Sequence, residues 1–164
     1  MNITNGSVFK DMTGIEYFNF EEDFVEKNIR CIPMIVRFKM DKAGIKLKLA
    51  EWSIFSVEER IQLAMMPCNI KGDAKLYHDF LAGLIKHYTD KEATILAIDQ
   101  YPLWIEGNDV PGILLERLQS FNWDIPGQQW SELTNLQRFA LLKLCKPGHE
   151  SKNFPRAMKE FGLT

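Results

Sequence analysis

Residues 73–88 read DAKLYHDFLAGLIKHY, and their apolar members recur at steps of three and four residues. That spacing places apolar side chains on one side of an α-helix and polar side chains on the other. Asp73 is a residue type that caps helix N-termini. The segment therefore predicts an amphipathic helix, whose buried side is formed by Leu76, Tyr77, Phe80, Leu81, Leu84, Ile85 and Tyr88.

Further helices are predicted on both sides of this segment. Ser56 with Glu59, and Thr134 with Gln137, have the spacing of a capping box, in which two side chains bond to each other's backbone N–H groups. Five or six helices with short connections predict a mainly α, compact bundle. We find no internal repeat in the sequence. The remaining helices are predicted after Glu21-Glu22-Asp23, over 111–121 and over 151–162.

Residues 33–49 fit two local structures. Pro33 at a first helical position and Gly44 as a terminating residue favour a helix followed by an extended stretch. Residues 36–40 and 45–49, however, each alternate apolar and basic side chains, as two strands joined by a turn would. We favour the helix and keep a short β-hairpin near residues 36–49 as the alternative.

Length and composition predict one globular domain. The chain has 164 residues, of which 46% are hydrophobic and 26% charged, which argues against a disordered chain. Residues 1–15 contain few apolar anchors and are predicted to form a flexible N-terminal arm, which leaves 16–164 as a single helical domain. No apolar run approaches the ~20 residues that span a bilayer, and no signal peptide is visible. These features predict a cytoplasmic protein without a transmembrane segment.

Charge is unevenly distributed along the chain. With a net charge of −2, the chain lacks the broad positive field on which general nucleic-acid binding depends. Residues 27–48 nevertheless hold seven Lys and Arg against one Asp, and residues 135–164 hold six against two Glu. These segments either neutralise acidic segments within the fold or form a surface for an acidic partner.

The three cysteines, Cys31, Cys68 and Cys145, are too few and too widely spaced for a complete disulfide framework. They predict reduced thiols. Cys31 adjoins Arg30 and Cys145 adjoins Lys146, and a nearby cation lowers a thiol pKa. Cys31 and Cys145 are therefore candidate reactive thiols, with a buried, inert role as the alternative.

No catalytic constellation is visible. His78 and His87 lie nine residues apart on one predicted helix, so they point to opposite sides and cannot share a metal ion. Neither a nucleophile elbow nor a phosphate-binding glycine loop occurs. We therefore predict no catalytic residue, no metal site and no cofactor. Trp104 and Trp123, in loop regions, are the tryptophans that best fit an interface.

Several strings of residues resemble the nitrate reductase-associated protein family. The resemblance covers the first half and the last third of the chain, and residues 69–129 add little to it. It implies a small bacterial cytoplasmic protein that assists nitrate reductase, with no assigned catalytic residue. The strings are Phe18-Asn19-Phe20-Glu21, Arg30-Cys31-Ile32-Pro33-Met34, Val36-Arg37-Phe38-Lys39-Met40-Asp41, Gly44-Ile45-Lys46-Leu47, Trp52, Pro67-Cys68, Leu133-Thr134, Leu136-Gln137-Arg138-Phe139-Ala140-Leu141, Lys143-Leu144 and His149-Glu150-Ser151-Lys152-Asn153-Phe154.

Together these observations favour a non-enzymatic accessory or maturation protein for assimilatory nitrate reductase. Its partner is the reductase or the maturation machinery, and the contact is expected to act in molybdenum cofactor insertion. A thiol-based redox or metal-binding regulator using the three cysteines is the alternative from another class, and an enzyme whose pocket forms only in the fold is a third. The candidate interaction surface comprises Arg30, Arg37, Arg138, Lys143, His149, Lys152 and Asn153.

Overall fold

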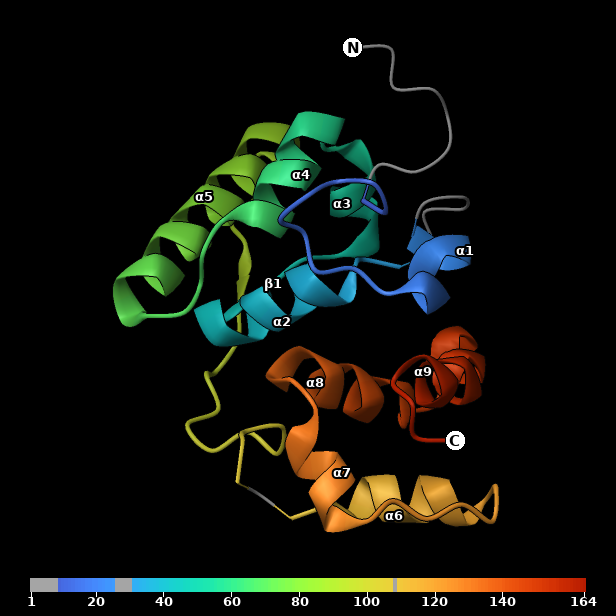
Figure 1. Ribbon diagram of the computed structural model, residues 1–164. Helices are drawn as coiled ribbons and strands as arrows, with labels where there is room; N and C mark the ends of the chain where they lie inside the picture. The colour runs from blue at the N-terminus through green and yellow to red at the C-terminus, as the bar shows by residue number, and fades with distance from the viewer. Residues whose placement is uncertain (1–8, 26–30, 108) are drawn as a thin grey trace. The chain divides into compact units, whose positions relative to one another are not determined.

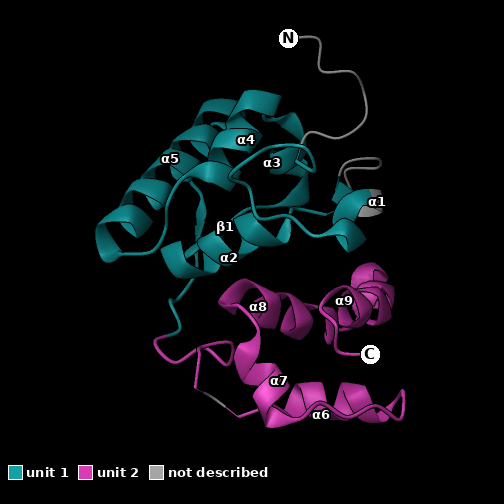
Figure 2. Ribbon diagram, in the orientation of Figure 1, with its two compact units in different colours: residues 1–99 teal, residues 100–164 magenta. Residues whose placement is uncertain are grey.

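The computed structural model of the chain describes residues 9–25, 31–107 and 109–164. Its internal contacts divide the chain into two compact units, residues 1–99 and 100–164, which are described separately below (Figures 1 and 2). The flexible arm over residues 1–15 and the single helical domain over 16–164 stay predictions. Phe9, inside the predicted arm, is buried.

Unit 1 is built mainly from helices, together with two short strands. The chain order follows the labels of Figure 1. Its elements are η1 (Asn19–Glu21), α1 (Glu22–Val25), α2 (Met34–Ala43), β1 (Ile45–Lys46), α3 (Leu49–Ile54), α4 (Val57–Met65), α5 (Lys71–Thr89) and β2 (Thr94–Ile95).

Helix α5 is the long amphipathic helix that the sequence predicts, and it packs along α2 and against α3. Tyr77, Leu81 and Ile85 are fully buried on its inner side, and the Tyr77 hydroxyl donates to the Leu63 carbonyl over 2.8 Å. Leu76, which was predicted to face inward, is 65% exposed. The buried side of α5 therefore contains fewer of its apolar residues than predicted.

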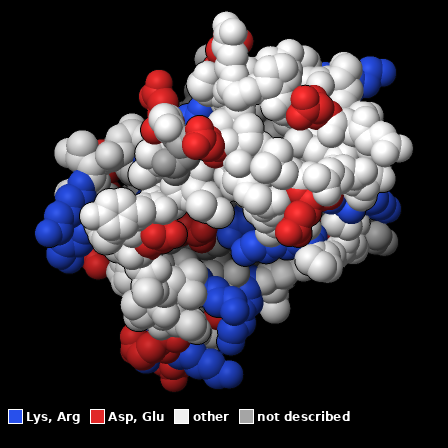
Figure 3. Space-filling view, turned by 90° about the horizontal axis from the view of Figure 1, so that it is seen from below, with Lys and Arg blue, Asp and Glu red and all other residues white. Residues whose placement is uncertain are grey.

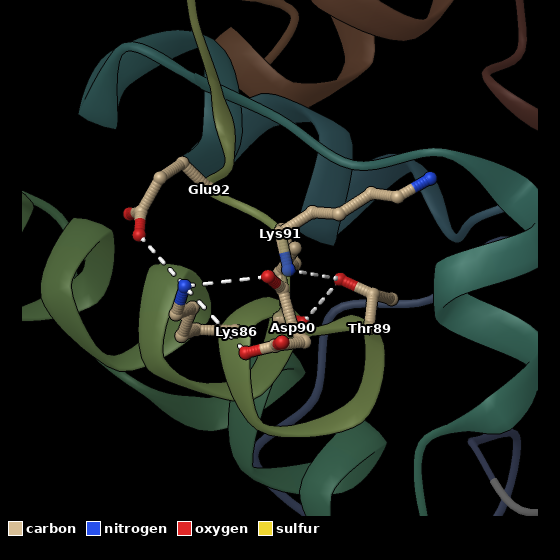
Figure 4. A network of polar contacts seen from close by, with 6 residues as sticks. Lys86, Thr89, Asp90, Lys91 and Glu92 are labelled. Carbon is tan, nitrogen blue, oxygen red and sulfur yellow. Dashed lines mark hydrogen bonds and ion pairs between the residues drawn. The ribbon is translucent and has the colours of Figure 1, made fainter.

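Side chains in the last turn of α5 bond to the residues just beyond its C-terminal end (Figure 4). The Lys86 ammonium lies 3.2 Å from Glu92 Oε1 and donates to the Asp90 carbonyl over 3.3 Å. Thr89 Oγ1 donates to the Ile85 carbonyl over 2.6 Å and accepts from Lys91 N over 3.2 Å. These bonds tie the last turn of α5 to the residues that follow it. Asp90 adopts a left-handed conformation with φ 56° and turns the chain toward β2.

The segment over residues 33–49 forms the predicted helix followed by an extended stretch. Gly44 ends α2 in the left-handed conformation at φ 69°, and β1 follows directly. Strand β1 pairs antiparallel with β2, Ile45 opposite Ile95, rather than with residues 36–40, which are helical. A Cβ at Gly44 would lie 2.9 Å from the Leu96 carbonyl oxygen. Glycine is thus required there by both its φ angle and the close approach of the second strand.

The N-terminal part of unit 1 is held by aromatic and polar contacts. The Phe9 ring stacks on Tyr17 and Trp52, with centroids 6.0 and 6.3 Å away. The buried Glu21 carboxylate accepts from Met34 N over 2.6 Å. Met34 is the first residue of α2, so Glu21 satisfies one of the free N–H groups at that helix start.

The regular elements described in unit 2 are all helices. Helices α8 and α9 pack together, and both α6 and η2 pack on α8. Its buried core includes Leu114, Leu118, Phe139 and Phe154. Its elements are α6 (Gly112–Gln119), α7 (Gly127–Glu132), α8 (Asn135–Leu144), η2 (His149–Asn153) and α9 (Phe154–Glu160).

The mainly helical fold class is confirmed, and both predicted capping boxes are formed. Glu59 N donates to Ser56 Oγ and Gln137 N donates to Thr134 Oγ1, each over 3.1 Å. The described helices are more numerous than the five or six predicted. The additional ones include α3 and α7, six residues each. Helices this short are stabilised mainly by packing. They contain too few residues to show the apolar periodicity from which longer helices are predicted.

Candidate functional site

Arg138, one of the predicted contact residues, lies in the interior of unit 2 at 2% exposure. Its Nη1 donates to the carbonyls of Leu133, Ser131 and Trp130 over 2.6, 3.2 and 3.3 Å. Its Nε donates to the Trp104 carbonyl over 2.8 Å. A guanidinium has five N–H donors and no acceptor, so a cluster of carbonyls is a matching environment. The described geometry gives Arg138 a structural role.

The position of Arg138 follows from the two helices that flank it. Helix α7 ends at Glu132, and α8 begins with its N-cap at Thr134, so the last carbonyls of α7 face the first turn of α8. Arg138 stands one turn into α8 and reaches back to these carbonyls. Its guanidinium carbon also lies 5.9 Å from the ring centroid of Trp130. The side chain thus joins the end of one helix to the start of the next.

The other predicted residues of unit 2 divide between interior and surface. Lys143 is half-buried, with its ammonium 5.0 Å from the centre of the Phe139 ring. Asn153 is buried, and its Oδ1 accepts from Arg156 Nη1 over 3.2 Å. His149 and Lys152 are exposed. Of these four residues, His149 and Lys152 are therefore the ones exposed to solvent, and Lys143 is partly exposed.

Two exposed residues that the sequence analysis did not single out, Arg156 and Lys159, extend this surface. Together with His149 and Lys152 they recur at steps of three, four and three residues along η2 and α9. A 3₁₀ turn has three residues and an α turn 3.6, so these side chains follow one side of the segment. We call His149, Lys152, Arg156 and Lys159 the basic ridge. The i, i+3, i+7, i+10 spacing of basic residues was the signal available in the sequence.

A half-buried cation, Arg117, supports the segment that carries the basic ridge. Arg117 of α6 donates from Nη2 to the Ser151 carbonyl over 3.2 Å. Its guanidinium carbon lies 5.1 and 5.3 Å from the ring centres of Phe121 and Phe154. Arg117 therefore ties η2 and the start of α9 to α6. Figure 3 shows one face of the molecule, on which Lys and Arg form separate groups interrupted by Asp and Glu.

The two remaining predicted contact residues belong to unit 1. Arg37 is half-buried on α2. Arg30 lies outside the described residues.

Cys145, one of the two candidate reactive thiols, and Cys68 lie in environments that favour the protonated form. Cys31 and Cys68 are buried and Cys145 is half-buried. Burial raises the pKa of the Cys145 thiol to about 11, although Arg117 acts in the opposite direction. Burial also raises the pKa of Cys68, against the influence of Lys42 and Lys39. Because the thiolate is the nucleophile, this geometry does not support reactivity at Cys68 or Cys145.

We expect Cys68 and Cys145 of the native protein to resist alkylation. At pH 7.5 a pKa near 11 lowers the thiolate fraction of Cys145 on the order of a hundredfold relative to an unperturbed cysteine. The measurement is iodoacetamide labelling at pH 7.5 followed by peptide mass spectrometry, with protein unfolded in urea as the control. Labelling of native Cys145 as fast as in the unfolded chain would contradict the burial described here.

Among the described residues, no group of three or more His, Cys, Asp or Glu side chains is placed to hold a metal ion. His78 Nδ1 lies 2.9 Å from the Ala43 carbonyl oxygen, and the His87 ring packs edge-on against Tyr88. Trp104 and Trp123 are half-buried, whereas Trp52 and Trp130 are core residues. In the part of the chain that is described, no helix has the length and apolar character needed to cross a bilayer.

A comparison with protein families identifies a match over most of the chain. The model of the conserved nitrate reductase-associated protein family matches residues 17–161, which is most of the chain and part of both units. The match confirms the resemblance found in the residue strings. No curated protein and no solved structure matches the chain.

Proposed function

The chain belongs to the conserved nitrate reductase-associated protein family, and we propose that it is a non-enzymatic accessory protein of assimilatory nitrate reductase. It acts in the cytoplasm by contact with the reductase or with its maturation machinery. The basic ridge is the contact surface. We extend the proposal to the insertion of the molybdenum cofactor, an anionic group that a row of cations would favour.

The single observation that carries the proposal is the exposure of the basic ridge on a well-supported segment. Lys152 and Lys159 extend from η2 and α9, while Arg117 of α6 holds this segment through its bond to the Ser151 carbonyl. Complementary charge speeds encounter and selects partners. A side chain on a fixed backbone also loses less freedom on binding than one on a mobile loop. The ridge therefore suits an acidic protein surface.

The alternative of a thiol-based regulator has no comparable support. The pKa values of Cys68 and Cys145 are raised by burial, which is opposite to the direction that a redox-sensing thiol needs. Among the described residues no cysteine takes part in a cluster suited to a metal ion. The accessory role is the function that the described geometry favours.

Reversal of charge on the ridge is expected to abolish the accessory function without unfolding the protein. In a strain deleted for the gene, the wild-type chain should restore nitrate reductase activity, and Lys152→Glu/Lys159→Glu should not. The amount of reductase polypeptide should stay unchanged, because a maturation defect leaves polypeptide without turnover. The affinity of the purified double variant for the reductase should fall by at least about tenfold.

The matched control is Lys71→Glu/Lys75→Glu, which makes the same change of charge on the exposed side of α5. It should support full reductase activity. Thermal unfolding of both double variants should resemble that of the wild type, since exposed charges contribute little to stability. Full complementation by the ridge variant would refute the ridge as the contact surface. Normal reductase activity in the deletion strain would refute the accessory role itself.

A further inference from the structure

We propose that residues 33–66 and 111–144 are two copies of one helical module, related by a shift of 78 residues and placed one in each unit. The sequence analysis found no internal repeat, and this proposal departs from that reading. The inference uses the backbone, burial and hydrogen bonds of each unit taken separately. It is independent of the function proposed above.

The sequence match is strongest over twelve residues. Residues 52–63 read WSIFSVEERIQL and residues 130–141 read WSELTNLQRFAL. Trp, Ser, Arg and Leu are identical at the first, second, ninth and last positions. Three further positions differ only by conservative exchange, Phe55 for Leu133, Ser56 for Thr134 and Glu59 for Gln137. Four identities are too few to establish a repeat from the sequence alone, because each identical residue can also be explained by its own local structure.

The backbone repeats in the same register. Helices α3 and α7 both have six residues, and their C-caps, Phe55 and Leu133, share φ −68° and ψ 152°. The next residues, Ser56 and Thr134, are N-caps with ψ 161° in both copies. Further upstream, α2 and α6 start after Pro33 and Pro111, which have ψ 145° and 147°. The shift of 78 residues holds at each of these sites.

The turn after the first helix of each copy also corresponds. Gly44 and Asn122 both have positive φ angles, 69° and 56°. Asparagine is among the few residues other than glycine that tolerate this region. Buried side chains recur at the same shift as well. The buried pairs are Val36 with Leu114, Met40 with Leu118, Leu47 with Ile125, Trp52 with Trp130 and Leu63 with Leu141.

Arg60 and Arg138 make equivalent contacts in the two copies. Arg60 donates from Nε to the Trp52 carbonyl over 3.1 Å and from Nη2 to the Ser53 carbonyl over 2.7 Å. Arg138 donates to the corresponding carbonyls of Trp130 and Ser131. The guanidinium carbon lies 5.7 Å from the Trp52 ring centre in one copy and 5.9 Å from that of Trp130 in the other. In both copies, the arginine donates hydrogen bonds to carbonyls near the C-terminal end of a six-residue helix.

The correspondence ends after the third helix of the module. Leu81 of α5 is fully buried, whereas Lys159, which stands at the same shift in α9, is exposed. The residues shared by the two copies therefore maintain the module, and the segments that follow it are specific to each unit. The basic ridge belongs to the segment that is specific to unit 2.

The test is hydrogen exchange of the full-length chain. Arg60→Met should speed exchange of the amides in 49–66 on the order of tenfold and leave those in 127–144 unchanged, while Arg138→Met should do the reverse. Lys75→Met, on the exposed side of α5, is the control and should change neither segment. If Arg138→Met proves too unstable to purify, Arg138→Lys keeps the charge, loses the planar fork and gives the same readout.

Unchanged exchange in 49–66 of the Arg60→Met variant would overturn the equivalence of the two arginines. A crystal structure of the full-length chain provides a second measurement. The backbone of 33–66 should superpose on that of 111–144 with Trp52 on Trp130 and Arg60 on Arg138. A superposition that needs a different shift for α2 on α6 than for α4 on α8 would overturn the duplication.

Discussion

Replacing Arg138 with methionine is expected to lower the free energy of unfolding by about 3–5 kcal/mol. Methionine keeps much of the apolar volume but removes every donor. The carbonyls of Trp104, Trp130, Ser131 and Leu133 would then lose the bonds that Arg138 now makes to them. Hydrogen bonds to a charged group contribute about 1.5–3 kcal/mol each, and they are not additive. Urea denaturation followed by circular dichroism measures the effect.

Two further variants test whether the loss of stability comes from the hydrogen-bond donors of Arg138. Lys146→Met removes an exposed cation just beyond α8 and should change the free energy of unfolding by no more than about 0.5 kcal/mol. Arg138→Lys keeps a charge without the fork of donors, and should fall between the wild type and the methionine variant. Equal stability of Arg138→Met and the wild type would show that Arg138 does not occupy this interior position.

Replacing Trp52 with alanine is expected to cost about 3–5 kcal/mol. Trp52 is 1% exposed, and its removal leaves a cavity at the junction of α3 and α4. The loss also removes the stacking partner of Phe9 and the ring beneath Arg60. Limited proteolysis should therefore detect earlier cleavage near Phe9 in the variant, at a denaturant concentration where the rest of the chain stays folded.

Trp123→Ala is the matched control for this experiment. Trp123 is half-buried and stacks on Phe121 with centroids 4.6 Å apart, so its removal should cost about 1–2 kcal/mol. Cleavage near Phe9 should be unaffected. If Trp52→Ala and Trp123→Ala were equally destabilising, the assignment of Trp52 to the core of unit 1 would be wrong.

Much of the helical structure could be predicted because its causes are local. The capping boxes at Ser56 and Thr134 need only four residues, and both form as expected. The periodicity of residues 73–88 likewise predicts α5, although the helix starts at Lys71, before the predicted cap at Asp73. Pro33 and Gly44 bracket α2 for reasons of backbone geometry alone.

Other features depend on contacts between residues far apart in the chain and could not be predicted from the sequence. The partner of β1 is β2, about fifty residues away, so the alternating pattern of 36–49 gave no information about it. The burial of Arg138 was missed because arginine is normally exposed, and only its spacing of eight residues from a tryptophan, repeated at Arg60, pointed to the interior. The basic ridge was predicted in part, since His149 and Lys152 are exposed and Arg156 and Lys159 were not considered.

The pairing of β1 with β2 constrains the order in which unit 1 can fold. Bringing Ile95 to Ile45 closes a long loop, and a ladder of two residues returns few hydrogen bonds for the chain entropy lost. We therefore expect the ladder to become stable only once α3, α4 and α5 have formed and shortened the effective path between its ends. On this basis we expect the two strands to pair late in folding, on helices that have already formed.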